Sequence, residues 1–103
     1  MAFGDGSAPI FYGSDFQYWK VCMACFLESA CMDVWRITVE GFTPAVIPQT
    51  PTAKEEVLVM ANVKAKNLLY GAMTKDMFNT ISSCVTSHDI WTAIELIHED
   101  SEY

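Results

Sequence analysis

The chain has 103 residues, of which 51% are hydrophobic and 18% charged, and its 13 acidic and 6 basic residues give a net charge of −7. This length predicts a single domain with a packed core. The acidic balance argues against binding to nucleic acid or anionic membranes, because lysine and arginine supply that binding energy. No apolar run reaches the roughly 20 residues of a membrane span.

Residues 1–13 are predicted to form an extended arm, because three glycines and a proline interrupt them. The arm contains one apolar piece, Ile10, Phe11 and Tyr12. Its start lacks the basic and apolar pattern of a secretory signal. We therefore expect a cytoplasmic protein with reduced cysteines, and leave a nuclear location open.

Residues 14–103 are predicted to form one helical domain. Ser14 to Gln17 fits a capping box, followed by apolar residues at helical spacing as far as position 30. A short helix is expected over about 31–39, ending at Gly41. Three prolines then make 42–51 a loop.

The longest predicted helix covers about 53–72 and opens with a capping box at Thr52. Its larger apolar side runs from Val57 and Leu58 to Leu69 and Ala72. Three further apolar side chains gather on nearly the opposite side: Val59, Val63 and Tyr70. A helix with two apolar faces either lies at the centre of a bundle or keeps one face for a partner.

Two more helices complete an all-α fold of about five helices. Thr74 is predicted to cap a short helix containing Met77, Phe78 and Ile81, and Thr86 opens a helix over 88–99. The apolar stripe of that last helix is Ile90, Trp91, Ile94 and Ile97.

The cysteines do not form a recognisable metal or redox centre. Cys22 and Cys25 have a CxxC spacing, but a structural zinc ion needs two more ligands at close spacing. The remaining candidates are scattered: Cys31, Cys84, His88 and His98. A redox CxxC belongs at a helix N-terminus, whereas Cys22 lies more than a turn inside its predicted helix. We therefore expect no metal and no cofactor.

The alternative is that these cysteines are small packing residues, which we expect for Cys22 and Cys31. Cys25 lies on a flank shared with Tyr18. Either another helix covers that flank or Cys25 is partly exposed and oxidisable. We favour the covering helix, because Tyr18 would also be buried there.

No catalytic motif is present: there is no nucleophile elbow, phosphate loop or HExxH sequence. His98 lies beside the last apolar stripe and is expected to be a half-buried packing residue. Trp19, Trp35 and Trp91 are expected to anchor the core. The sequence therefore predicts a protein that is not an enzyme.

The succession PIFYGSDFQYWK, with a later DVW and EG, resembles the N-terminal, capsid-like part of the gag polyprotein of Copia-type LTR retrotransposons. These elements are common in plant genomes, also as isolated or domesticated copies. The matching positions are Phe11, Gly13, Tyr18, Trp19, Met23, Leu27, Gly41, Ala61, Ala65, Leu68 and Trp91. The chain departs from the family pattern at Cys31-Met32, at His98 and in the proline-rich 44–51 segment.

The resemblance implies a lobe that packs against copies of itself to build a shell, using protein contacts and no direct contact with nucleic acid. The contact residues would be the arm (Ile10, Phe11, Tyr12) or the second face of the long helix (Val59, Val63, Tyr70). The alternative is a co-opted module, such as a docking or decoy domain of a plant host protein. It would hold a peptide or protein in an apolar groove, with the arm as a displaceable lid.

Overall fold

The computed structural model describes residues 8–41 and 53–99. These residues form five helices and no strand, which confirms the predicted all-α fold. The helices are α1 (Phe16–Ala30), α2 (Met32–Glu40), α3 (Ala53–Tyr70), α4 (Lys75–Ile81) and α5 (Ser87–Glu99).

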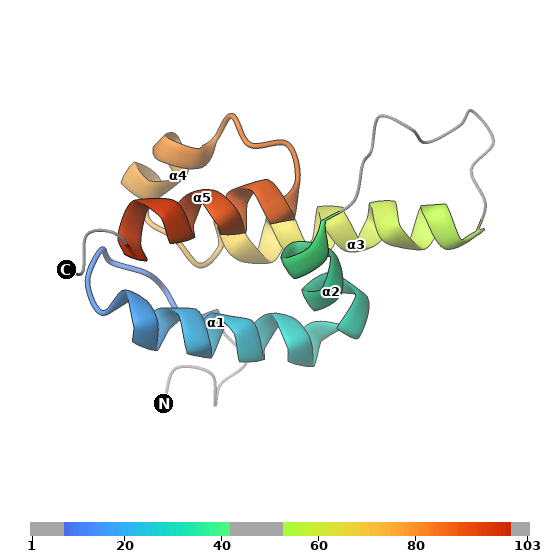
Figure 1. Cartoon of the computed structure of the whole chain (residues 1–103), viewed down its shortest axis with the longest axis horizontal. Helices are drawn as coiled ribbons and strands as arrows, with labels where there is room; N and C mark the ends of the chain where they lie inside the picture. Colours follow the sequence, from blue (N-terminus) through green and yellow to red (C-terminus); the bar gives the residue numbers. More distant parts are fainter. Residues whose placement is uncertain (1–7, 42–52, 100–103) are drawn as a thin grey trace.

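The short helix α2 packs against α1, α3 and α5, and α5 packs against all four other helices. Figure 1 shows α1 along one side of the molecule and α5 along the other, with α4 packed outside α5. The C-terminal half of α3 runs behind α5, whereas its N-terminal half extends past the other helices. The bundle therefore encloses only part of its longest helix.

The core is built from apolar side chains of all five helices, with Phe11 added from the N-terminal segment. Its fully buried members include Phe16, Met23, Leu27, Val34, Leu69, Ile81, Ile90 and Ile94. Trp19 and Trp91 are buried with ring centroids 5.9 Å apart, and Trp35 meets Trp91 edge-on at 5.7 Å. The predicted role of the tryptophans as core anchors is confirmed.

The extended segment before α1 is tied into this core. Phe11 donates its backbone N–H to the Ala72 carbonyl at 2.8 Å and forms an isolated bridge with Met73. The indole N–H of Trp19 donates to the Pro9 carbonyl at 2.7 Å. Residues 8–11 are therefore part of the folded domain.

The predicted capping box at Ser14 is wrong. Helix α1 begins at Phe16, one residue later than this box predicts. Its N-cap is Asp15, which has a left-handed backbone (φ 56°, ψ 48°) and makes no side-chain capping bond. Gly13 also has positive φ. The chain turns sharply here because Phe11 and Phe16, on either side of the turn, pack edge to face at 5.7 Å.

The later helix starts follow the sequence more closely. The Thr74 hydroxyl accepts a hydrogen bond from the Met77 backbone N–H, and the Thr86 hydroxyl accepts one from the Asp89 N–H. The capping box predicted at Thr52 lies outside the described residues. Helix α3 ends at Tyr70, two residues before the predicted end.

Several predicted burials are wrong. Cys31 is exposed, because it is the extended residue that joins α1 to α2. Cys25 and Tyr18 are exposed as well, because no described helix packs on that flank of α1. Ile97 is 41% exposed near the end of α5. Cys22 is buried as predicted.

A buried polar joint lies where α2, α3 and α5 meet. The Thr38 hydroxyl donates to the Val34 carbonyl and lies 3.1 Å from the Ser87 hydroxyl, and both threonine and serine are buried. The Ser87 backbone N–H donates to the Asn62 side-chain oxygen at 2.9 Å. His88 Nδ1 lies 3.1 Å from the Thr38 carbonyl. These bonds fix α3 against the other two helices.

Candidate protein-contact surface

The three arm residues predicted to make contacts do not act as one group. Phe11 is only 1% exposed and packs against Phe16, Trp19 and His98. Ile10 and Tyr12, its neighbours, are exposed. A lid that includes Phe11 would have to leave the core, so the structure does not support the displaceable arm. The predicted packing role of the half-buried His98 is confirmed by its contacts with Phe11 and Phe16.

The three residues predicted on the second face of α3 are also separated. Val63 is 54% exposed, whereas Val59 and Tyr70 are half-buried. Tyr70 packs edge to face against Phe78 of α4, with ring centroids 5.2 Å apart. Val63 alone of the three is an exposed apolar residue.

Val63 belongs to another face of α3, centred on Met60. At 100° per residue, seven side chains lie within about 60° of Met60 around the helix. They are Ala53, Glu56, Val57, Met60, Val63, Lys64 and Asn67, and all seven are exposed. We call this set the Met60 face.

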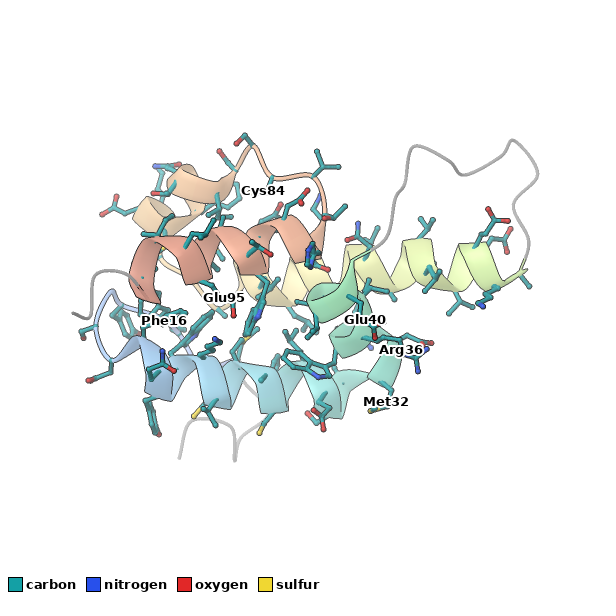
Figure 2. All side chains as sticks on the ribbon, viewed as in Figure 1. Phe16, Met32, Arg36, Glu40, Cys84 and Glu95 are labelled. Atoms are coloured by element: carbon teal, nitrogen blue, oxygen red, sulfur yellow. The ribbon has the colours of Figure 1, made fainter. Side chains whose placement is uncertain are left out.

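The Met60 face borders an apolar groove between α3 and α2, with a volume of about 560 Å³. Its walls are Ala53, Glu56, Val57, Met60, Ala61 and Lys64 from α3, and Asp33 and Val34 from α2, with Cys31 just before α2. Figure 2 shows Met32 and Arg36 on the outer side of α2, below the projecting half of α3. Helical periodicity predicted Val57 on the core side and Val63 on nearly the opposite side. Val57 is instead 50% exposed, because the bundle does not cover this part of α3.

The charges around the groove are few and placed at its rim. Asp33 and Glu56 contribute carboxylates and Lys64 an ammonium group. Asp33 lies 3.5 Å from Arg36, one turn along α2. Because both charged partners in that pair are solvent-accessible, the pair adds little stability. The floor of the groove is apolar.

A second exposed strip runs along the outer side of α1, through Tyr18, Val21 and Cys25. A hydrogen bond with the Cys22 side chain raises the pKa of the Tyr18 phenol. All three side chains come from α1, whereas the groove beside the Met60 face lies between two helices.

Among the described residues, no group of three or more His, Cys, Asp or Glu side chains could hold a metal ion. Burial, with a smaller effect from the Asp89 charge, raises the pKa of the Cys84 thiol. A raised pKa leaves this thiol protonated and a poor nucleophile at neutral pH.

None of the described helices combines the length and apolar character needed to cross a bilayer. In comparisons with known proteins, the chain matches no family model, no curated protein and no solved structure.

Proposed function

We propose that this chain is a non-enzymatic contact domain that associates with copies of itself, as a gag-type capsid lobe does. One observation carries the proposal: Val57, Met60 and Val63 are 50%, 66% and 54% exposed on a single face beside an apolar groove. Contiguous exposed apolar surface of this kind marks sites of protein contact.

The size of the Met60 face fits a weak, repeated contact. From Ala53 to Asn67 it is about 21 Å long at 1.5 Å per residue. A strip of that length buries on the order of 400 Å² per copy, about half of what a standard interface buries. Weak individual contacts suit an assembly in which each subunit meets several neighbours. We expect a dissociation constant of about 10–1,000 μM.

The proposal also includes the kind of partner and the cellular location of the domain. The net charge of −7 gives nucleic acid and anionic membranes little to bind, because phosphates are held by Lys and Arg. The partner is therefore a protein. We place the domain in the cytoplasm, with the nucleus as the second possible location.

The test is light scattering on a sizing column, in reducing buffer, from about 10 μM to about 1 mM protein, a range set by the expected affinity. We expect the average mass to rise with concentration. Met60→Glu, which places a charge at the centre of the face, should remove the rise. A constant monomer mass over the whole range would contradict the proposal.

The groove favours a second candidate, a module that binds an apolar segment of another protein. Its volume of about 560 Å³ lies within the range of ligand-binding clefts. A titration with amphipathic helical peptides, followed by NMR, would test it. Chemical-shift changes confined to Val34, Val57 and Ala61, in a protein that stays monomeric, would favour this module over self-association.

A further inference from the structure

The Met60 face has a charge order that specifies how two copies meet. Glu56 lies four residues before Met60 and Lys64 lies four residues after it, and both are exposed. Val57 and Val63 lie three residues to either side. About Met60, the apolar residues are therefore placed symmetrically along the helix, whereas the two charges have opposite signs.

We propose that two copies pair through α3 in antiparallel orientation, about a two-fold axis at Met60. In this pairing Glu56 of each copy lies level with Lys64 of the other, about 6 Å along the helix from the axis. Both side chains are long enough to meet across two helices packed 8–10 Å apart, roughly the usual spacing. Val57, Met60 and Val63 then form the apolar centre of the contact.

The charges oppose the parallel alternative. A parallel, in-register pair would set Glu56 beside Glu56 and Lys64 beside Lys64, and like charges at this distance repel. Antiparallel pairing replaces both repulsions with attractions, twice over because of the two-fold symmetry. The distribution of charge on the face thus selects a second copy of this chain as its complement.

The groove enlarges the contact beyond α3. Cys31 and Val34, on the α2 side of the groove, face the space next to Met60. A second α3 lying on the Met60 face would cover this opening and touch both helices. The pairing is thus a helix laid into the α2–α3 groove, and it remains an isologous contact.

This inference rests on the proposed self-association. Charge-reversal variants test the antiparallel pairing separately from self-association itself. By sedimentation equilibrium, Glu56→Lys and Lys64→Glu should each weaken association by about tenfold, because attraction becomes repulsion at two places in the dimer. The double variant E56K/K64E should recover the wild-type affinity. Val21→Glu, on the exposed outer side of α1, is the matched control and should leave association unchanged.

The native thiols give an independent readout. Cys31 lies in the groove and Cys25 on the outer side of α1, and both are exposed. Alkylation with iodoacetamide, followed by mass spectrometry, should slow at Cys31 as protein concentration rises, and stay constant at Cys25. All these substitutions are at exposed positions, and circular dichroism checks that each variant is folded.

The outcomes are distinct. If the wild type associates but neither single charge variant weakens it, or the double variant fails to recover, antiparallel pairing at Met60 is overturned and self-association stands. If Cys25 is protected in place of Cys31, the outer side of α1 is the interface. If the wild type remains monomeric, both this inference and the proposed function fail.

Discussion

The two halves of α3 have similar apolar content and opposite surroundings. In the C-terminal half, Ala65 and Leu69 are fully buried. In the N-terminal half, Val57 and Met60 are at least half exposed, and Figure 1 shows this half beyond the bundle. The C-terminal half therefore contributes to the core, and the N-terminal half exposes apolar surface that the core does not include.

The boundary between the halves is the polar joint. Asn62 of α3 accepts a hydrogen bond from the first residue of α5, Ser87, whose hydroxyl meets Thr38 of α2. Buried polar groups of this kind must be matched in position as well as in chemistry. The joint therefore fixes how far α3 enters the bundle and how much of it remains outside.

The largest effect is expected in the buried half. Leu69→Ala should lower the free energy of unfolding by about 3 kcal/mol, since it removes buried methyl groups and leaves a cavity. Urea denaturation monitored by tryptophan fluorescence measures the change. A loss below about 1 kcal/mol would mean that this end of α3 is less tightly packed than its complete burial indicates.

The sequence predicted the local features of both halves. Helical periodicity located all five helices and the inward side of α3, because that pattern is set within a few turns. The threonine caps at Thr74 and Thr86 are equally local, since each bonds an N–H three residues away.

What the sequence could not provide depends on distant partners. Phe11 is buried because it pairs with Ala72 and Met73, about sixty positions along the chain. Val57 looked like a core residue because a helical wheel shows direction but not where a neighbouring helix ends. Cys25 is exposed for the same reason, since no described helix reaches its flank. The Met60 face was not predicted. Its signal in the sequence is the spacing of Val57, Met60 and Val63, each three residues from the next.

The second largest effect is expected beside the joint, at Gly41. Gly41 ends α2 with φ 84° and ψ 169°, a conformation almost restricted to glycine. An added Cβ would also lie 3.1 Å from the His88 ring. Gly41→Ala should therefore cost about 2 kcal/mol, measured by urea denaturation.

Gly13→Ala is the control for that variant. Gly13 also has positive φ, but an added Cβ would meet nothing within 4 Å. Its cost should come from the backbone alone and be smaller. Equal costs at the two glycines would show that the His88 contact does not constrain the joint.

The joint itself should give the next largest effect. Thr38→Val keeps the shape of the side chain but removes its hydroxyl, so Ser87 loses a hydrogen-bond partner in a buried site. We expect a loss of about 1.5 kcal/mol. Ser87→Ala should cost a similar amount, and the double variant less than the sum, because both single changes break the same bond. Additive losses would contradict a coupled joint.

The smallest effect, with the opposite sign, is expected in the projecting half. Val57→Ala removes methyl groups from a residue that is already 50% exposed, and alanine favours a helix over valine by about 0.5 kcal/mol. Stability at low protein concentration should therefore stay the same or rise slightly, in contrast to Leu69→Ala. At high concentration the same variant should associate more weakly than the wild type, because Val57 lies next to Met60 on the proposed interface. A clear loss of monomer stability would mean that the bundle uses this half of α3 after all, and that the two halves do not divide folding from association.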